Sequence, residues 1–405
     1  MTGWVGRIIQ NRLLLSAFFL ASTAWVAGGS DTLPGMPRVV NPNDIYSEAR
    51  AGNLSPAVKG FPDLIYVPNS GSNTVDVINP HTFQVVNHFK VGRQPQHVTP
   101  SYDLKTLWAL NDLSDSLTRI NPANGQKEDT VPVKDPYNMY YTPDGKYAIV
   151  VAERTHRLDF RDPASMALVE SVPVPCRGID HLDFSADGSY LIGSCEFSGT
   201  LVKLDVARKA VVGTLSLGRS GHGEPRLEPS AATHAVSNHG GRRNFELRHA
   251  PSGSMPQDVR VSPDGKLFYV ADMLADGVHL IDGNKFINVG FIPTGRGAHG
   301  LYFSRDSKFL YCSNRDEGSV SVINVADGKV AQKWVIPGGG SPDMGGVSAD
   351  GKVLWLSGRY NSEVYAFDTA GGRLLARIPV GKGPHGLCVY PQPGRYSLGH
   401  TGILR

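Results

Sequence analysis

A turn that recurs at nearly constant spacing constrains the fold of this chain more than any other feature. The clearest copy is Ser262-Pro263-Asp264-Gly265-Lys266, which lies between two runs of alternating apolar and polar residues. Aspartates in equivalent turns follow one another at intervals of 41, 43, 77, 42 and 44 residues; they are Asp103, Asp144, Asp187, Asp264, Asp306 and Asp350. A period of about 40–45 residues is typical of a four-stranded propeller blade, and the longest interval is one period plus an insertion of about 35 residues. A turn-rich segment at 391–394 supplies a seventh copy.

Each copy contains four short segments that alternate with period 2, as half-buried strands do. In the third copy they cover residues 138–141, 147–151, 157–161 and 168–174. Segments 64–68, 74–78 and 85–91 form an N-terminal copy without a first strand, whereas 385–390 is a first strand that nothing follows. We therefore predict an all-β, seven-bladed β-propeller over residues 61–395, with four antiparallel strands per blade. Its first blade is closed by the C-terminal strand, which leaves no long exposed sheet edge.

Two of the repeats carry a family pattern. Tyr66-Val67-Pro68-Asn69 and Tyr311-Cys312-Ser313-Asn314 each precede an alternating strand that ends in asparagine. On these residues the chain resembles the YVTN-repeat seven-bladed propellers, which include exported and lactonase-like proteins. The resemblance implies the fold and leaves the activity open, because similar repeats occur in surface-layer proteins, exported proteins, lactonase-like enzymes and cofactor-dependent oxidoreductases. The chain departs from the pattern at Glu153-Arg154-Thr155 and in the insertion.

The two ends of the chain lie outside the repeats. Arg7 and Arg12 precede an apolar run at 13–27, and small residues follow, so residues 1–29 are predicted to be an export signal peptide. The alternative is an uncleaved membrane anchor, since 8–27 approaches the ~20 residues that span a bilayer. Either reading gives a periplasmic or secreted protein that contacts a membrane only through this segment. Residues 30–60 are predicted to be a linker and 396–405 a C-terminal tail.

The charge of the chain argues against one class of partner, and its cysteines predict a disulfide. The net charge is only +3, and Lys and Arg do not cluster on one face, so no nucleic-acid partner is expected. Folding the hairpin about Asp187 brings Cys176 and Cys195 to the same end of adjacent strands, which predicts a disulfide in an exported chain. Cys312 and Cys388 fall in non-adjacent blades and are expected to be free, buried thiols.

Candidate site residues gather where the first strand of each blade begins, at one end of the central channel. They are Gln96, His97, Asn138, Asp180, His181, Asp258, His299, Asp343 and His385, and the second strands add Glu153, Arg154, Arg315 and Arg359. Three interpretations stay open. In the first, the polar side chains solvate the mouth of a water-filled channel. In the second, the arginines and histidines bind an anion. In the third, a divalent transition metal is bound by two to four of His97, His181, His299 and His385. The sequence identifies no other cofactor.

The inserted loop, residues 218–254, leaves the same end of the ring and contains His222, His234, His239 and His249. It is either a surface loop or a lid over the channel. Two GxGxxG matches, at 295–300 and 381–386, connect strands and lack the helix N-terminus that a dinucleotide fold needs. We expect a binding scaffold that recognises a small molecule or a protein partner through the polar rim. The alternative is a lactonase- or lyase-like propeller enzyme with rim histidines as base or metal ligands.

Overall fold

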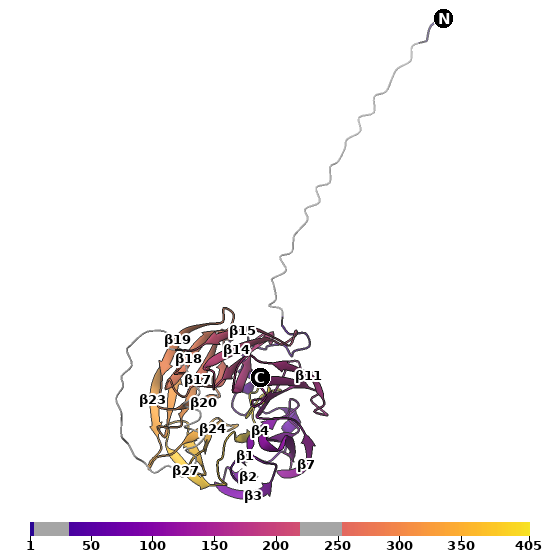
Figure 1. Ribbon diagram of the computed structural model, residues 1–405. Helices are drawn as coiled ribbons and strands as arrows, with labels where there is room; N and C mark the ends of the chain where they lie inside the picture. Colours follow the sequence, from indigo (N-terminus) through magenta and orange to yellow (C-terminus); the bar gives the residue numbers. More distant parts are fainter. Residues whose placement is uncertain (4–31, 219–252) are drawn as a thin grey trace. The chain divides into compact units, whose positions relative to one another are not determined.

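Seven four-stranded antiparallel sheets surround one axis, which confirms the predicted β-propeller (Figure 1). The computed structural model describes residues 1–3, 32–218 and 253–405, and the unit that forms the propeller begins at Thr32. Blades 1 to 3 contain the following strands: β28 (Cys388–Tyr390), β1 (Leu64–Asn69), β2 (Thr74–Asn79) and β3 (Gln84–Lys90); β4 (Pro95–Pro100), β5 (Leu107–Asn111), β6 (Ser116–Asn121) and β7 (Gln126–Pro132); β8 (Asn138–Tyr141), β9 (Ala148–Ala152), β10 (Arg157–Arg161) and β11 (Leu168–Pro173).

Blades 4 to 7 repeat the arrangement with β12 (Ile179–Phe184), β13 (Tyr190–Cys195), β14 (Thr200–Asp205) and β15 (Ala210–Ser216); β16 (Pro256–Val261), β17 (Leu267–Asp272), β18 (Gly277–Asp282) and β19 (Ile287–Pro293); β20 (Ala298–Phe303), β21 (Phe309–Asn314), β22 (Ser319–Asn324) and β23 (Lys329–Val335); β24 (Pro342–Val347), β25 (Val353–Gly358), β26 (Glu363–Asp368) and β27 (Leu374–Pro379). The described residues also include three short 3-10 helices, η1 (Ser47–Ala49), η2 (Pro56–Val58) and η3 (Asp112–Ser114).

The first blade closes as predicted. β28 pairs antiparallel with β1, with Leu64 opposite Tyr390 and Tyr66 opposite Cys388. Three residues of β28 pair continuously with β1, and Pro384 forms a further bridge to Asn69, so the residues between them leave the ladder. The two ends of the repeat region are therefore joined by a short strand pair and this bridge.

The recurrent turn has a side-chain hydrogen bond that explains its sequence. Ser262 Oγ donates to Asp264 Oδ1 at 2.6 Å, and the amide of Lys266 donates to the same oxygen at 3.2 Å. Gly265 has a φ of +71°, a left-handed conformation that glycine adopts without steric cost. The same hydroxyl–aspartate bond recurs at Asp103, Asp144, Asp187, Asp306 and Asp350. We call the end of the ring that carries these turns the turn face, and the opposite end the loop face.

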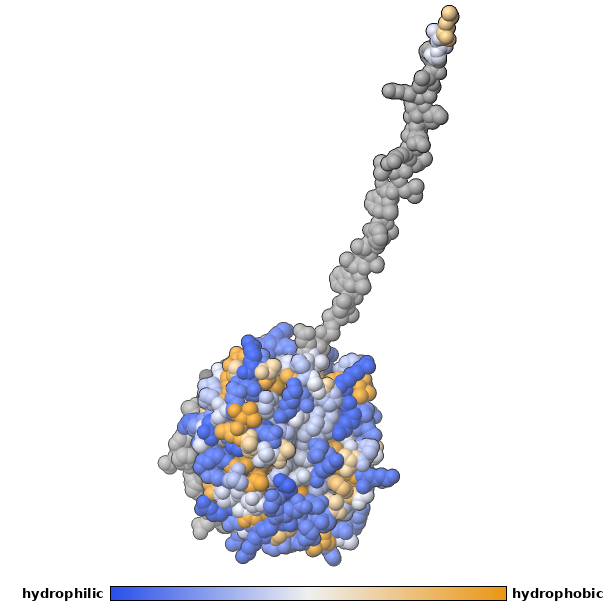
Figure 2. Space-filling model, turned by 90° about the vertical axis from the view of Figure 1, so that its right-hand side faces the viewer, coloured by the Kyte–Doolittle hydropathy of each residue, from blue (hydrophilic) through white to orange (hydrophobic). Residues whose placement is uncertain are grey.

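Burial falls from the axis outward. Every residue of β4, β12 and β16 is buried, whereas the outermost strand β3 is mostly exposed. Exposed apolar residues such as Val86, Val169 and Val289 lie on these outermost strands. Figure 2 shows that the apolar patches on the viewed side are scattered among hydrophilic residues. Within the described residues, no helix has the length and apolar character needed to cross a membrane.

Two segments cross the turn face. The N-terminal strap, residues 32–60, donates backbone hydrogen bonds from Leu33 to Asp187, from Ile45 to Pro263 and from Gly52 to Ala349. Ile45, Tyr46 and Val58 are buried beneath it, so this segment packs on the propeller and is not the loose linker that the sequence indicates. The C-terminal strap, residues 391–405, ends near the middle of the ring (Figure 1).

A disulfide joins Cys176, in the loop before β12, to Cys195 at the end of β13. Their Cα atoms are 6.1 Å apart, within the usual range for a bridge. Cys312 and Cys388 are free and fully buried. The bridge fixes the loop that leads into the innermost strand of blade 4, where two of the candidate site residues lie.

Candidate functional site

The innermost strands are irregular where they begin, and this irregularity creates the site. In five blades the ladder to the second strand shifts register over two residues near the loop face. In blade 2, for example, the shift lies between Pro95 and Val98, so Gln96 and His97 leave the ladder. Bulges of this kind redirect side chains and are common beside functional sites. The same irregularity carries Asp180, His181, Asp258, His299 and Asp343.

These side chains are buried, which argues against the first of the three interpretations, polar side chains that solvate an open mouth. His97, His181, Asp180, Asp258 and Asp343 have no exposed surface, and His299 and His385 are only 1% and 2% exposed. The reason is that the imidazole rings pack against one another. The ring of His97 lies 5.4 Å from that of His181 and 4.9 Å from that of His385, measured between centroids. A mouth lined by separately hydrated side chains is therefore excluded for these residues.

A fifth histidine comes from the C-terminal strap and was not among the predicted site residues. The backbone amide of His400 donates to the carbonyl of Met139 at 2.8 Å. Its fully buried ring stacks on Tyr140, with 5.9 Å between centroids and an angle of 6° between the planes. Ser397 bonds to the carbonyl of Pro100 near the turn face, so the strap enters the channel from that side. The predicted C-terminal tail is thus part of the site.

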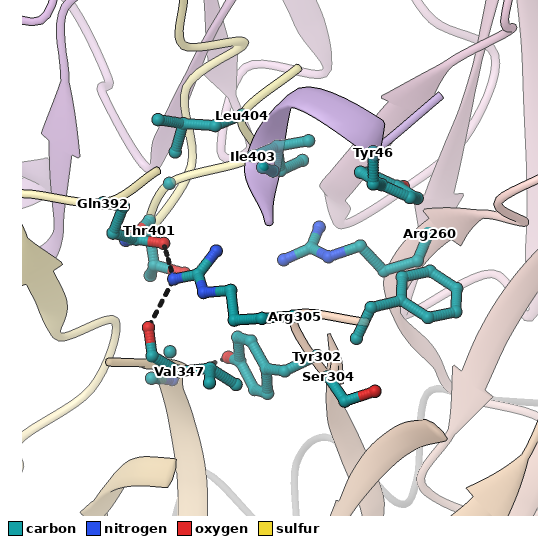
Figure 3. A pocket seen from close by; sticks show the side chains of 15 residues that line it. Tyr46, Arg260, Tyr302, Ser304, Arg305, Val347, Gln392, Thr401, Ile403 and Leu404 are labelled. Carbon is teal, nitrogen blue, oxygen red and sulfur yellow. Dashed lines mark hydrogen bonds between the residues drawn. The ribbon is translucent and has the colours of Figure 1, made fainter. Parts of the chain in front are cut away.

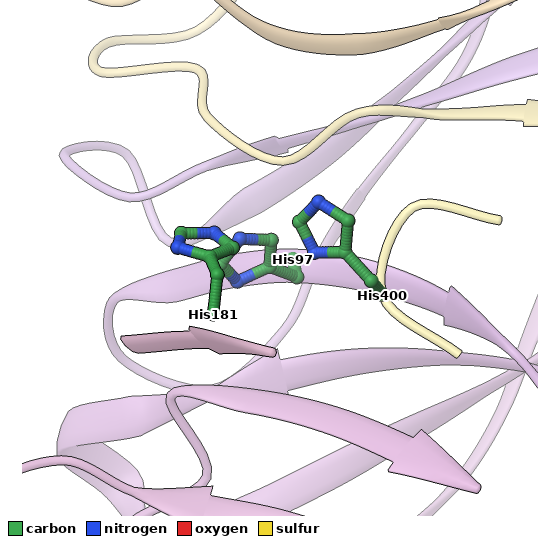
Figure 4. Close-up of side chains that lie close together, drawn as sticks. All are labelled: His97, His181 and His400. Atoms are coloured by element: carbon green, nitrogen blue, oxygen red, sulfur yellow. The ribbon is translucent and has the colours of Figure 1, made fainter. Parts of the chain in front are cut away.

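His97, His181 and His400 form the tightest group (Figure 4). Each ring offers one nitrogen, and the three nitrogens lie within 4.8 Å of one another. The rings come from β4, β12 and the C-terminal strap, three segments far apart in the sequence. The Nε2 atoms of all three are buried without a hydrogen-bond partner among the described residues. Buried polar atoms are rarely left unpaired, so this convergence indicates a bound species.

Neighbouring groups orient the three rings. His97 Nδ1 lies 2.9 Å from the carbonyl oxygen of Tyr137, so it carries the hydrogen and donates it, which leaves a lone pair on Nε2. His181 Nδ1 lies 2.9 Å from Asp180 Oδ1. His400 Nδ1 lies 3.0 Å from the side-chain amide of Asn138, a group that can serve either as donor or as acceptor. Metal-binding histidines have such outer partners, which fix the ring and its tautomer.

Burial also keeps His97 and His400 neutral. Removal from water lowers the pKa of both well below the ordinary 6.5; His181 lowers the pKa of His97 further, and Arg260 followed by neighbouring histidines lowers that of His400. The pKa values of His299 and His385 are lowered well below 6.5 in the same way, with Arg315 and Arg359 adding to the effect of burial. Neutral imidazoles have the free lone pair that a metal ion requires.

Three buried carboxylates surround the histidines, and one of them has no cationic side chain beside it. Asp258 pairs with Arg260 at 3.1 Å, and Asp343 pairs with Arg315. Among the described residues, no lysine or arginine nitrogen lies within 4.0 Å of Asp180, and neither of its oxygens has a hydrogen-bond partner. A buried carboxylate without a cation is costly. The cluster therefore has a site for positive charge beside His181.

Asp343 organises the other two predicted histidines. Its carboxylate lies 2.7 Å from His385 Nδ1, 3.0 Å from His299 Nδ1 and in contact with the Arg315 guanidinium. Desolvation raises the pKa of Asp343, but Arg315, His299 and Arg359 together outweigh it and hold that pKa below its usual value. His385 Nε2 lies 3.5 Å from Tyr137 Oη. The second pair is thus held by an ionised aspartate beside the three-histidine group.

The remaining predicted residues lie around this centre. Gln96 and Asn138 are buried, and Gln96 accepts a hydrogen bond from Arg359 at 3.4 Å. Arg154 does not join the histidines, because it forms ion pairs with Asp112, Asp115 and Asp135 on the loop face. Glu153 is only 4% exposed beside it. The loop predicted at 218–254, with its four histidines, lies almost entirely outside the described residues.

Comparison with known proteins assigns the family. The profile of the YNCE-like β-propellers matches residues 22–164 and 243–394, more than half of the chain. The chain belongs to this family. No curated protein matches this YNCE-like propeller.

Solved structures agree on the fold. Hydrazine synthase of Kuenenia stuttgartiensis is 17% identical with a TM-score of 0.59, covering 76% of this chain and 93% of that one. Dihydro-heme d1 dehydrogenase NirN, in complex with DHE, is 14% identical with a TM-score of 0.55, covering 84% and 77%. A protein of unknown function from Desulfotomaculum acetoxidans is 14% identical with a TM-score of 0.59, covering 81% and 98%. At these identities the likeness extends to the propeller architecture alone.

The donor set of this YNCE-like propeller favours one kind of chemistry. Imidazole nitrogens suit zinc, copper, iron and nickel, whereas calcium and magnesium prefer oxygen ligands. A tetrahedral ion with bonds of ~2 Å needs nitrogens about 3.3 Å apart. The three nitrogens lie within 4.8 Å of one another, so they must move closer to bind one ion at that spacing. The arrangement can therefore hold one transition-metal ion with three protein ligands.

Proposed function

We propose that this protein is an exported β-propeller that binds one divalent transition-metal ion through His97, His181 and His400. The observation that carries the proposal is the convergence of three fully buried Nε2 atoms that have no partner among the described residues. Asp180 supplies the negative charge that a cation needs beside His181, and hydrogen bonds with Tyr137 and Asn138 hold the rings of His97 and His400. Export rests on the charged and apolar pattern of residues 1–29.

The contacts among the rings disfavour a larger ligand between them. The centroid distances are 5.4 Å for His97–His181, 5.2 Å for His97–His400 and 4.9 Å for His181–His400. A planar macrocycle would have to separate these rings, whereas a single ion needs their nitrogens to move closer. The DHE bound by NirN is therefore no guide to the ligand of this chain. An anion is also disfavoured at this point, because Asp180 faces His181 without a cation.

The test is metal binding by the wild type and by single variants. Protein refolded with chelator present and then dialysed should take up about one Co²⁺ or Zn²⁺ per chain, measured by elemental analysis and, for Co²⁺, by its visible spectrum. His97→Ala, His181→Ala and His400→Ala should each weaken binding by more than the ~100-fold upper range for loss of an outer-shell partner. Asp180→Asn should weaken it by about 10- to 100-fold, because it removes an outer-shell partner.

Two other histidines provide matched controls. His279 is 7% exposed and contacts Asp272 in blade 5, outside the cluster, so His279→Gln tests the general effect of removing a buried imidazole. His81 is an exposed histidine whose side chain is 73% accessible. Both variants should bind the metal as the wild type does. Equal affinity in the wild type, His97→Ala and His400→Ala, each shown to be folded by circular dichroism, would contradict the proposal.

A second candidate function, metal-assisted hydrolysis or elimination, is favoured by His385. Its Nδ1 lies 2.7 Å from Asp343, its Nε2 lies 3.5 Å from Tyr137 Oη, and its ring lies 4.9 Å from that of His97. An imidazole oriented by aspartate beside a metal-bound water has the arrangement of a general base. Arg359, which donates to the neutral side chain of Gln96, would then bind an anionic substrate such as a hydroxy acid.

This candidate is separated from simple binding by His385→Asn. Turnover of lactones and esters by the metal-loaded wild type, lost in His385→Asn while the metal content is unchanged, would support an enzyme. A metal-loaded wild type without turnover of these substrates would leave metal binding as the proposed function.

A further inference from the structure

A partly open pocket lies on the turn face, apart from the three-histidine group. Its volume is about 60 Å³, and it is lined by Tyr46, Arg260, Arg305, Gln392, Thr401 and Ile403, among others. Figure 3 shows the guanidinium groups of Arg260 and Arg305 in this space, with that of Arg305 directed toward Val347 and Gln392. One water needs about 10–15 Å³ measured in this way, so the cavity has room for about four water-sized groups. That is enough for a halide or a compact tetrahedral oxyanion.

The charges around the cavity do not balance. Arg260 is 5% exposed and pairs with Asp258 at 3.1 Å. Arg305 instead donates to neutral oxygens: the carbonyls of Val347 and Ser348 and the side chain of Gln392. Among the described residues no carboxylate oxygen lies within 4.0 Å of the Arg305 guanidinium. Two cations therefore face one small space that no carboxylate lines; Arg260 has one carboxylate in direct contact and Arg305 has none, while Asp183 and Asp350 act on them from farther away.

The pKa of Arg305 agrees with this description. Burial lowers that pKa to about 10, and Asp350 offsets the effect only in part. A guanidinium is nevertheless still charged at neutral pH, so its charge needs compensation. Planar guanidinium groups bind oxyanions through two parallel hydrogen bonds, and a pair of them forms a strong site for a small anion.

We infer that the cavity between Arg260 and Arg305 binds a small inorganic anion, a halide or a tetrahedral oxyanion, that fixes the C-terminal strap to blades 5 and 6. The strap forms one wall of the cavity with Gln392 and residues 401–404, and the N-terminal strap contributes Tyr46 and Ala49. A bound anion therefore links both straps to Arg260 on β16 and to Arg305 in the turn after β20. The site is separate from the proposed metal centre, since none of the three histidines lines it, although Thr401 follows His400 directly in the chain.

Bromide and selenate are the direct probes. Crystals of the wild-type protein soaked in sodium bromide or sodium selenate should show an anomalous peak within hydrogen-bond distance of both guanidinium groups. In solution, the melting temperature should rise with the logarithm of the chloride, sulfate or phosphate concentration. Sodium gluconate at matched ionic strength should not raise it, because gluconate is too large for the cavity. The ranking of chloride against the oxyanions identifies which of the two the site prefers.

Arg305→Gln should abolish the anion-dependent part of the melting temperature. Arg208→Gln is the matched control, because Arg208 pairs with Asp205 on the surface with 72% of its side chain accessible. Arg305→Gln also removes hydrogen bonds to the Val347 and Ser348 carbonyls and could prevent folding. If that variant does not fold, the crystal experiment on the wild-type protein still tests the inference. Equal melting temperatures in all four salts, or soaked crystals without a peak between the two arginines, would overturn the inference.

Discussion

The metal-free protein should lose much of its stability between pH 8 and pH 5.5. Burial lowers the pKa of His97, His299, His385 and His400 well below the 6.5 of the unfolded chain. Below pH 6.5 the unfolded chain therefore binds more protons than the folded one, and the free energy of unfolding falls as the pH falls. The stabilisation is fully present above pH 6.5 and is lost as the pH drops toward the lowered pKa values.

The size of the effect follows from proton linkage. A histidine that is neutral in the folded state and has a pKa of 6.5 in the unfolded state costs about 1.4 kcal/mol at pH 5.5. Four such residues cost about 6 kcal/mol, which is comparable to the whole stability of many proteins, about 5–15 kcal/mol. Most carboxylates titrate below this window. Asp112, whose pKa burial raises to about 6, titrates within it and opposes the loss, but it is one group against four histidines.

Urea unfolding followed by tryptophan fluorescence, with chelator present, measures this dependence. In His97→Gln/His400→Gln the loss between pH 8 and pH 5.5 should be about half that of the wild type, because two of the four groups are gone. His81→Gln, at an exposed position, should leave the dependence unchanged. A free energy of unfolding that is constant from pH 8 to pH 5.5 would refute the reasoning, since it would mean that the cluster takes up protons as readily as the unfolded chain.

Two further predictions concern the covalent and terminal restraints. The disulfide joins cysteines that are 19 residues apart. Cys176→Ser/Cys195→Ser should therefore lower the free energy of unfolding by about 3 kcal/mol, as expected for a bridge that closes a loop of this length. Urea unfolding without reductant measures the loss. A chain ending at Tyr390 retains the strand that closes blade 1 but lacks His400, so it should stay monomeric in size-exclusion chromatography while losing Co²⁺ binding. A chain ending at Gly383 lacks β28 as well and should aggregate, because the edge of β1 is exposed. Co²⁺ binding by either truncated chain would contradict the role of His400. A soluble monomer from the shorter chain would contradict the role of β28.

The repeat explains why much of the architecture and part of the site could be predicted. Turn aspartates such as Asp264 set the register, and that register places one residue of each blade at the start of an innermost strand. His97, His181, His299 and His385 occupy equivalent positions, so ring closure brings them together whatever the details of the loops. The repeat period alone therefore predicts that these four histidines lie close together.

The burial of these residues and the role of His400 could not be predicted in the same way. His400 lies after the last repeat, in Gly399-His400-Thr401, and no period relates it to the other histidines. Its position depends on tertiary contacts with Met139, Tyr140 and Asn138. The C-terminal strap also determines the burial of the site histidines. Residues 391–405 fill the channel, whereas the blade pattern alone suggests an open one. A glycine-flanked histidine just beyond the closing strand was the only signal in the sequence.

The C-terminal segment connects closure of the ring with assembly of the site. β28 completes blade 1 by pairing with β1, and the strap then crosses the channel until Arg405 contacts Asp183 and the carbonyls of Phe184 and Ser185 in blade 4. His400 lies between these two anchors, so its position requires both. His97 and His181 belong to blades that fold from local hairpins, whereas the third imidazole arrives only when the ends of the repeat region have met. Bringing together the two ends of the repeat region closes a long loop, which is entropically costly, so these contacts form late in folding. The three-histidine group is therefore complete only in the closed ring. A metal ion bound to all three histidines would therefore stabilise the closed ring specifically, since an open ring offers it only two of the three ligands.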